Sequence, residues 1–354
     1  MKIASAIYLI VGKIKKKRYW NRFFSHQKNS FNRDKKAIRE ANRLGFTIDE
    51  ATIYNLQKNN YHDYVREVER HVLRDKLSDL RILLDNKLVF YHLIKSYAPT
   101  NTIYGYKAHW GDFHWLDAVF DSPIDLIVKK GKVCFKKSSS GCGEGFHIVE
   151  HSDSQFLIDR KPATKGEVFQ LLDSQDYFLE EFCIQSDFEN ALFPYAVNTI
   201  RIITLQEPNG EFRIVSSMHR FGSSGESVVD NASAGGLFSM IDPSTGRMDA
   251  ALSYQALQYV NERDVRFTRH PVTGSQIEGV VIPNWQLIKD TVLDLHQRIG
   301  FCGLNFIAWD IAHTNDGPVI IEGNTTSSVD LLQANGGLRN GYLGDYYRRM
   351  GIIK

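Results

Sequence analysis

The chain has 354 residues, of which 43% are hydrophobic and 24% charged, the composition of a globular protein that can bury a sizeable core. Collagen-like, low-complexity and wholly disordered proteins are therefore excluded, and the length suggests two or three domains or lobes. The cysteines lack the paired spacing of a zinc finger or a disulfide framework, which favours a reducing, cytoplasmic compartment. They are Cys134, Cys142, Cys183 and Cys302.

Charge is unevenly distributed along the chain. The first 45 residues contain 13 Lys or Arg against two acids, whereas the remainder contains 30 Lys or Arg against 39 acids. Residues 1–20 combine an apolar run, Ile3 to Val11, with a basic cluster, Lys13 to Arg18. The run is too short for a spanning helix and lacks the order of a signal peptide. We therefore expect a cytoplasmic protein whose residues 1–20 form either an amphipathic arm on the anionic inner face of a membrane or a basic helix packed on its own domain.

The N-terminal region, residues 1–95, is predicted to be helical. From Arg33 to Leu84, apolar residues recur at helical spacing among charged ones. Gly45 interrupts this pattern, and Asp49 with Thr52 is a plausible start for a new helix.

After Pro99 the sequence changes to short β-rich runs separated by glycine-containing turns. Closely spaced strands joined by turns favour antiparallel hairpins over a regular alternation of strands and helices, so we expect an α+β fold. Helices are expected at 166–172 and 285–298. The expected strands are residues 124–129, 133–137, 146–150, 177–184, 199–205 and 212–221.

The segment CFKKSSSGCGEGFHIVE, residues 134–150, joins two expected strands by a loop of serines and glycines. Gly141, Gly143 and Gly145 would let backbone N–H groups approach an anion, and Lys136 would add a positive charge. We expect a hairpin that covers phosphates, although an ordinary flexible hairpin would have a similar composition. The loop matches neither the P-loop nor a dinucleotide-binding fingerprint.

A second motif is a predicted hairpin of strands 307–311 and 319–324. Side chains alternate along a strand, so Glu322 and Asn324 share a face, and strand pairing can bring Asp310 beside them. Two carboxylates and an amide oxygen suit Mg²⁺, which completes its shell with water and phosphate oxygens. The alternative is a charged hairpin end that holds no ion.

Together these motifs resemble the ATP-grasp superfamily, in which a nucleotide lies between two α+β lobes. The resemblance covers about residues 85–330 and keeps the family's order: phosphate lysine and glycine loop, acidic hinge strand, arginine strands, then metal ligands. It divides the chain into a basic helical region at 1–95 and lobes at 96–183 and 184–354. More narrowly, the chain is similar to the sugar-transfer-associated ATP-grasp family in its motifs NTIRIITL, HRFG, VDNASAGG, HPVTG and IEGN.

The resemblance implies which residues bind ATP. Lys136 corresponds to a lysine that contacts the phosphates, with Lys137 as its competitor and Lys87 as the second such lysine. Glu180 corresponds to the acceptor of the adenine amino group, with Glu181 as the alternative register, unless this is simply an acidic edge strand. The other implied nucleotide-binding residues are Ser140, Gly141, Gly143 and Gly145 of the loop, Cys183 at the hinge and Asp187 at the ribose.

The resemblance also implies catalytic and substrate-binding residues. Besides Lys136, Arg201 and Arg220 correspond to strand arginines that face the transferred phosphoryl group, a role that suits a guanidinium because it stays charged and binds phosphate oxygens in pairs. A strand arginine paired with a surface carboxylate is the alternative. Asp310, Glu322 and Asn324 correspond to the Mg²⁺ ligands. The residues implied at the substrate site are Asp230, Asn231, Gly235, Gly236 and His270.

The implied activity is that of a carboxylate–amine ligase that uses ATP and Mg²⁺. Such an enzyme activates a carboxylate as an acyl phosphate, releases ADP and lets an amine displace phosphate. The expected partners are an amino acid or similar amine and a carboxylate-bearing sugar or glycan precursor of a cell-surface polysaccharide, such as a capsule. The alternatives are an ATP-grasp phosphotransferase acting on a hydroxyl, and a non-catalytic membrane- or nucleic-acid-binding protein that uses the basic arm. The acidic remainder of the chain disfavours nucleic acid as a partner.

Overall fold

The computed structural model describes most of the chain, and the described residues fall into two compact units. One unit comprises the described residues up to Lys76 and those from Thr326 onwards, and it is helical. The other comprises Leu77–Tyr254 and Arg266–Thr325, and it holds two β-sheets. The described residues are 18–26, 34–108, 111–116, 120–138, 145–173, 176–224, 230, 235–254 and 266–354.

Only the end of the predicted N-terminal arm lies within the described residues. Residues 18–25 are helical, and Trp20 packs against Gly45 and Arg66 of the first unit. Residues 1–17 lie outside the described part of the chain. Within the described part, no helix is both long enough and apolar enough to cross a membrane.

Local sequence signals account for the helices of the first unit. Gly45, at a φ of 88°, ends helix α2 in the left-handed conformation that glycine favours. Thr47 then caps α3 through a reciprocal pair of hydrogen bonds with Glu50, so this helix starts before the predicted position at Asp49. The elements of this unit are α2 (Lys35–Leu44), α3 (Ile48–Ile53), η1 (Tyr61–Asp63), α4 (Glu67–Lys76), α11 (Val329–Leu332) and α12 (Tyr342–Arg349).

Two distant parts of the sequence meet in the first unit through Gln333. Its buried side-chain amide donates to the Val65 carbonyl at 2.8 Å and to the Tyr54 hydroxyl at 3.0 Å, and its oxygen accepts from the Val65 backbone at 2.9 Å. These bonds satisfy an amide that would otherwise be costly to bury. The residues after Thr325 therefore group with the N-terminal helices, whereas the sequence placed them in a lobe at 184–354.

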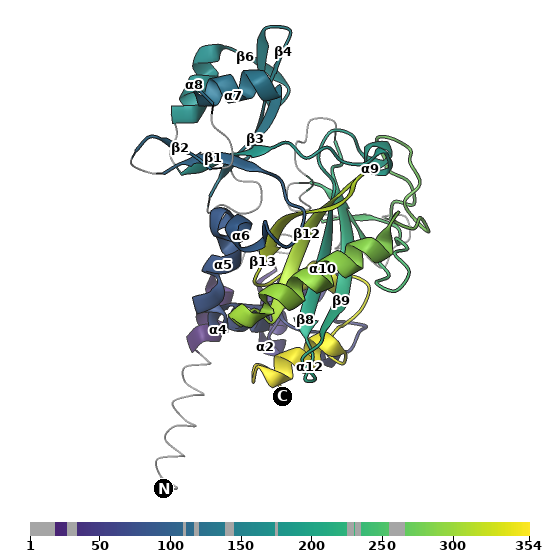
Figure 1. Cartoon of the computed structure of the whole chain (residues 1–354). Helices are drawn as coiled ribbons and strands as arrows, with labels where there is room; N and C mark the ends of the chain where they lie inside the picture. The colour runs from purple at the N-terminus through teal and green to yellow at the C-terminus, as the bar shows by residue number, and fades with distance from the viewer. Residues whose placement is uncertain are drawn as a thin grey trace, which may run out of the picture. The chain divides into compact units, whose positions relative to one another are not determined.

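The first sheet of the second unit has seven antiparallel strands in the order β2-β1-β7-β3-β4-β5-β6. Helices α7 and α8 cover one face, where Leu126 and Val168 pack with Phe135 and Leu179 of the strands (Figure 1). The opposite face carries the polar side chains described below. The elements are β1 (Ile103–Lys107), β2 (Phe113–Trp115), α7 (Pro123–Lys130), β3 (Lys132–Lys137), β4 (His147–Ser152), β5 (Gln155–Ile158), β6 (Lys161–Ala163), α8 (Lys165–Asp173) and β7 (Tyr177–Glu181).

One predicted strand is a helix. The apolar run at 124–129 predicts a strand, but the structure places it in α7. Ser122 caps this helix by accepting a hydrogen bond from the Asp125 backbone, Pro123 occupies the first turn, and Gly131 ends it. These flanking residues outweigh the β-branched content of the run, because propensity is only a weak preference.

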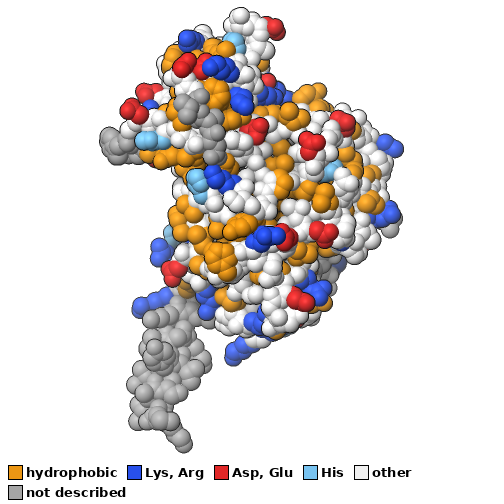
Figure 2. All heavy atoms as spheres, viewed as in Figure 1, with side chains coloured by type: hydrophobic (Ala, Val, Ile, Leu, Met, Phe, Trp, Pro, Cys, Tyr) orange, Lys and Arg blue, Asp and Glu red, His pale blue; other side chains and the backbone are white. Residues whose placement is uncertain are grey.

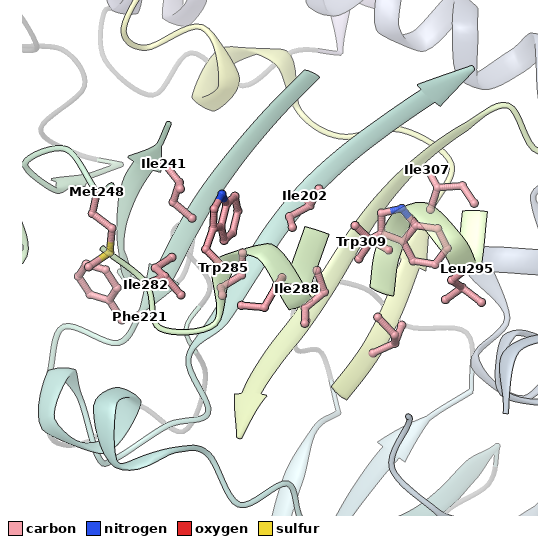
Figure 3. Close-up of a cluster of buried hydrophobic side chains, with 14 of the residues drawn as sticks. Ile202, Phe221, Ile241, Met248, Ile282, Trp285, Ile288, Leu295, Ile307 and Trp309 are labelled. Atoms are coloured by element: carbon pink, nitrogen blue, oxygen red, sulfur yellow. The ribbon is translucent and has the colours of Figure 1, made fainter. Parts of the chain in front are cut away.

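The second sheet has six antiparallel strands in the order β11-β10-β9-β8-β12-β13. Helix α10 covers one face, and Figure 3 shows its Trp285, Ile288 and Leu295 among strand residues that include Ile202 and Trp309. The strands are β8 (Thr199–Gln206), β9 (Phe212–Phe221), β10 (Leu237–Ile241), β11 (Leu252–Ser253), β12 (Phe306–Thr314) and β13 (Gly317–Asn324). The remaining elements are η2 (Ser78–Leu80), α5 (Ile82–Asp85), α6 (Lys87–Ile94), α9 (Asp187–Leu192), α10 (Trp285–Ile299) and η6 (Gly300–Cys302).

Two antiparallel sheets with helices packed on them confirm the predicted α+β class. The predicted helices at 166–172 and 285–298 correspond to α8 and α10. On the face shown in Figure 2, acidic and basic side chains of the described residues are interspersed rather than separated by sign.

Candidate active site

A cluster of charged side chains occupies one face of the second sheet, opposite α10. The strand register places Arg201 of β8 beside Asp310 of β12, and Asp310 beside Glu322 of β13. Thr199 of β8 lies beside Arg220 of β9. Because paired residues on neighbouring strands point to the same side, four strands bring these groups together. The predicted proximity of Asp310 and Glu322 is present in the structure.

Asp310 is the centre of this cluster. Its carboxylate is buried and accepts hydrogen bonds from Arg201 Nε and, at 2.7 Å, from Arg201 Nη2. Arg220 Nη2 lies 3.0 Å from the same carboxylate. Burial alone would raise the pKa of Asp310, but the two guanidinium groups lower it well below its usual range. Asp310 is therefore an ionised carboxylate.

Glu322 has the opposite electrostatic character. Burial and the neighbouring charge of Asp310 raise the pKa of Glu322 above its usual value, and the two carboxyl groups share a hydrogen bond. The Asn324 amide donates to Glu322 Oε1 at 3.3 Å. Adjacent acids whose pKa values are pushed apart tend to share one proton, and a divalent cation can replace that proton.

The three predicted metal ligands therefore fit Mg²⁺ in their chemistry. Asp310, Glu322 and Asn324 offer oxygen atoms from two carboxylates and one amide, and Mg²⁺ takes few protein ligands, completing its shell with water and phosphate. Among the described residues, no group of three or more His, Cys, Asp or Glu side chains is placed to hold a metal, so this mixed set stays a prediction. Both oxygens of Asp310 also contact arginines, so a bound cation would share that carboxylate with them.

The first sheet contributes a single buried ion pair. Lys136 of β3 and Glu180 of β7 are joined by an ion pair between Lys136 Nζ and the Glu180 carboxylate. Burial opposes the charge of Lys136, but Glu180 outweighs it and raises the pKa of the amine, with a smaller contribution from Glu322. This influence of Glu322 links the ion pair to the cluster on the second sheet.

The structure shows which of two adjacent lysines on β3 and which of two adjacent glutamates on β7 lie on the same face of the sheet. Lys137 is exposed and lies against Gly145, where a Cβ atom would be 2.7 Å from Lys137 Cε. Glu181 is also exposed, and its carboxylate accepts a hydrogen bond from the Thr102 backbone at 3.3 Å. Since adjacent strand residues point to opposite faces, the geometry places Lys136 and Glu180 together and turns their neighbours away.

The other predicted nucleotide-binding residues occupy different positions. Lys87 begins α6, and its charge offsets part of the rise in the pKa of Glu322 that burial and Asp310 cause. Burial raises the pKa of Cys183 to about 12, so this hinge thiol is uncharged. Asp187 is exposed at the start of α9, where its backbone donates to Asn315 Oδ1 at 3.1 Å. Ser140, Gly141 and Gly143 lie outside the described residues.

One of the predicted substrate residues belongs to the charged cluster. Asp230 is buried, lies 3.6 Å from Arg220 and accepts a hydrogen bond from Thr199. Burial raises the pKa of Asp230 even though Arg220 opposes this. Gly235, at a φ of 99°, accepts a bond from Ser223 through its carbonyl. Gly236 follows it, and Asn231 lies outside the described residues.

His270 is separate from the cluster. Its ring is buried, with Nε2 2.8 Å from the Gly222 carbonyl and Nδ1 accepting from the Val272 backbone at 3.2 Å. Both nitrogens are thus engaged within the protein, and burial lowers the pKa of the ring. This geometry corresponds to a turn-closing residue rather than a substrate contact.

The sequence analysis missed Thr199. Its hydroxyl contacts Asp230 and accepts from Arg220 Nη2 at 2.6 Å, so it connects two members of the cluster. Strand alternation could have predicted this position, because Thr199 precedes Arg201 by two residues on the same strand and therefore shares its face.

Comparison with known proteins identifies one family and several structures. The sugar-transfer associated ATP-grasp family matches residues 68–341. No curated protein shows a significant match.

Similar solved structures include the ADP complex of purK, N5-carboxyaminoimidazole ribonucleotide synthetase, at 10% identity and a TM-score of 0.40, covering 73% of this chain and 51% of that one. D-alanyl-alanine synthetase A from Vibrio cholerae O1 biovar eltor str. N16961 is 12% identical with a TM-score of 0.42, over 76% of this chain and 64% of that one. ATP-grasp ligase PsnB, complexed with minimal precursor, Mg and ADP, is 9% identical with a TM-score of 0.37, over 75% of this chain and 57% of that one. This chain thus spans less than two thirds of the length of each of these structures.

Proposed function

Because the chain belongs to the sugar-transfer associated ATP-grasp family, we propose that it is a carboxylate–amine ligase that uses ATP and Mg²⁺. The observation that carries the proposal is the buried cluster in which two arginines surround one ionised acid, Asp310, beside a second acid, Glu322, whose pKa is raised. Such a cluster suits an anionic group whose charge changes during a reaction, because fixed donors need no reorganisation.

The residues of this chain divide the work of phosphoryl transfer. Arg201 and Arg220 place guanidinium groups beside the acids, where they can balance charge on the transferred phosphoryl group. Mg²⁺, when bound, would supply Lewis-acid neutralisation of phosphate oxygens. Asp310 is ionised, and a bound cation would favour the ionised form of Glu322, whose pKa is raised in its absence.

The ion pair of the first sheet would serve the nucleotide. Glu180 would accept a hydrogen bond from the adenine amino group, and Lys136 would contact phosphate oxygens. Binding of the nucleotide would therefore replace the ion pair between Lys136 and Glu180 by one contact from each residue to the nucleotide. The mechanism needs no nucleophilic side chain. Burial raises the pKa values of Cys134 and Cys183 to about 12, so neither thiol near this pair is a ready nucleophile.

We further propose that the carboxylate belongs to a sugar or glycan precursor and that the amine is an amino acid or a related compound. The family's association with sugar transfer supports this substrate class. A role in cell-surface polysaccharide synthesis at the inner face of the membrane follows from the same association and from the basic N-terminal sequence.

The test is a screen of uronic acids and amino acids for release of ADP from MgATP by the full chain. A ligase should release ADP and phosphate together and form an amide. When the carboxylate carries ¹⁸O, one labelled oxygen should appear in the phosphate, since the acyl phosphate passes it on. A stable phosphoester without free phosphate would instead identify a phosphotransferase and overturn the proposal.

A further inference from the structure

A second buried polar cluster lies behind the candidate active site. Strand alternation turns His219, which precedes Arg220, toward the opposite face of the sheet, where it pairs in register with Ile200 of the apolar core. His313 of β12 shares this face with Ile311. The same strands therefore carry the arginine and acid cluster on one face and two buried histidines on the other.

Glu189 of helix α9 joins the two histidines. Its side chain is fully buried, with Oε1 2.9 Å from His219 Nε2 and 3.8 Å from His313 Nδ1. Among the described residues, no Lys or Arg forms an ion pair with Glu189, and the two imidazoles are its charged or polar partners on this face. His219 is the closer of the two, and burial lowers the pKa of His313 despite the charge of Glu189.

The cluster continues into the segment that connects the two sheets. Ser186, which caps α9, has its hydroxyl 3.0 Å from His313 Nδ1 and donates its backbone N–H to the His313 carbonyl at 2.8 Å. Gln185 accepts a hydrogen bond from the Asn198 backbone at 2.9 Å, immediately before β8 begins. These bonds fix the segment that follows the predicted adenine contacts Glu180 and Cys183.

The polar groups of this cluster are only partly paired with one another. Four of its buried polar atoms have no hydrogen-bond partner within the part of the protein that the structure describes: Glu189 Oε2, Asn198 Oδ1, His219 Nδ1 and His313 Nε2. Unsatisfied buried polar atoms are costly, and replacing a buried ion pair by apolar residues is often neutral or stabilising. A buried pair is better explained by the unique geometry that it imposes than by the stability that it adds.

We propose that Glu189, His219 and His313 are positioning residues that hold the nucleotide hinge in register with the strands bearing Arg220 and Asp310. This inference rests on the proposed function, because the hinge matters only if a nucleotide binds there. Helix α9 carries Asp187 and follows the hinge directly, so its attachment to β9 and β12 sets where the adenosine lies relative to the phosphoryl-transfer face (Figure 1).

The test measures binding of MgADP and of adenosine to the full chain by calorimetry, with variants Glu189→Gln and His219→Gln. Both variants keep hydrogen-bonding groups but remove the carboxylate–imidazole pair. We expect each variant to raise the dissociation constants of MgADP and of adenosine by the same factor, about tenfold. The reason is that the hinge would contact the adenosine part, which both ligands contain. Lys136→Met should weaken MgADP and leave adenosine almost unchanged.

The chain offers a matched control in His296. This histidine is also fully buried on the covered face of the sheet, 2.6 Å from Thr204 Oγ1 and 3.0 Å from the Leu304 carbonyl. Among the residues that the structure describes, it pairs with no carboxylate and with no hinge residue. His296→Gln should lower the melting temperature and leave both dissociation constants within about twofold. Equal weakening by His219→Gln and His296→Gln would reduce the cluster to ordinary core packing and overturn the inference.

A measurement on the unaltered chain covers the case in which a variant does not fold. With ¹⁵N-labelled histidine, the side-chain signals of His219 and His313 should shift when MgADP is added, and that of His296 should not. Unmoved signals at His219 and His313 would contradict the inference, as would unchanged binding by folded Glu189→Gln. If the unaltered chain bound no MgADP at all, the proposed function would fail together with this inference.

Discussion

The two sheets of the second unit hold buried charge in different ways. On the second sheet, each group has several partners: Arg220 contacts Asp230, Asp310 and Thr199, and Asp310 contacts both arginines and Glu322. On the first sheet, Lys136 and Glu180 form a single ion pair. When one side chain of a network is removed, the remaining members still have partners. When one side chain of a pair is removed, the other is left as an uncompensated buried charge.

The comparison also separates two consequences for function. Changes in the network of the second sheet should act mainly on turnover, because its groups face the phosphoryl group that changes charge. Changes in the pair of the first sheet should act mainly on nucleotide affinity. The experiments below test this division, from the largest expected effect to the smallest.

Removing the acids of the network should have the largest effect. Asp310→Asn and Glu322→Gln should each reduce MgATP turnover by about 10³-fold, since each removes a negative charge from the cation site. Glu322→Gln should keep the fold, because glutamine has nearly the shape of glutamic acid and keeps hydrogen-bonding groups, and ADP release with thermal unfolding checks both statements. Asn324→Asp should be milder, as it keeps an oxygen ligand. Full activity in both acid variants would show that the cluster is structural.

Breaking the single pair should act on binding. Lys136→Met should raise the Kd for MgATP by about 30-fold, equivalent to about 2 kcal/mol, and should lower stability by leaving Glu180 buried and alone. Adding Glu180→Gln should restore stability without restoring affinity.

The exposed neighbour Lys137 provides the control for this pair. Lys137→Met should change Kd and melting temperature little, because its side chain lies on the other face of β3. A larger loss in Lys137→Met than in Lys136→Met would mean that the nucleotide contacts the opposite face.

Binding of Mg²⁺ should depend on pH in one direction. The raised pKa of Glu322 means that a proton competes with the cation, so the apparent Kd for Mg²⁺ should fall as pH rises through that pKa. The same raised pKa favours the folded state when Glu322 is protonated. Stability without Mg²⁺ should therefore decrease as pH rises from the pKa of an unfolded glutamic acid to the raised pKa of Glu322 in the folded protein. Calorimetric titrations at several pH values check this, and Glu322→Gln should abolish the dependence. A pH-independent Kd in the unaltered chain would exclude the shared proton.

The smallest effect on turnover is expected from the N-terminal arm. Deleting residues 1–17 should release the protein from anionic vesicles while activity on a soluble acceptor stays nearly unchanged. The deletion stops before Trp20, because this residue packs against Gly45 and Arg66. High salt should also weaken sedimentation of the full chain with vesicles, since charge is screened. Failure of the full chain to sediment with anionic vesicles at low salt would contradict the membrane role.

The sequence predicts those parts of the site that are local. The hairpin of β12 and β13 follows from alternation around the Asn315–Gly317 turn, and alternation also puts Glu322 and Asn324 on one face. The resemblance adds Arg201 and Arg220, which the structure brings together. The local prediction that was wrong is the strand at 124–129. The composition of this run favours a strand, but its capping residues favour the helix that the structure contains.

What the sequence does not reveal is contact between distant residues. Glu189 and His313 are separated by more than a hundred residues, and neither belongs to a recognisable motif, so no local pattern predicts the cluster behind the active site. Sequence spacing likewise predicts that Lys136 or Lys137 faces the nucleotide, and only strand pairing with β7 shows that Lys136 is the one beside Glu180.

The hydrogen bonds of Gln333 have a consequence for the order of events during synthesis. The helical unit needs both the N-terminal helices and the residues after Thr325, so its first part emerges from the ribosome long before its partner exists. The residues between them, with both sheets, can fold in the meantime, since domains generally fold as units when their chain is available. Translation must pass Gln333 before the backbone of Val65 gains its amide partner, so the helical unit closes only after both sheets have been synthesised.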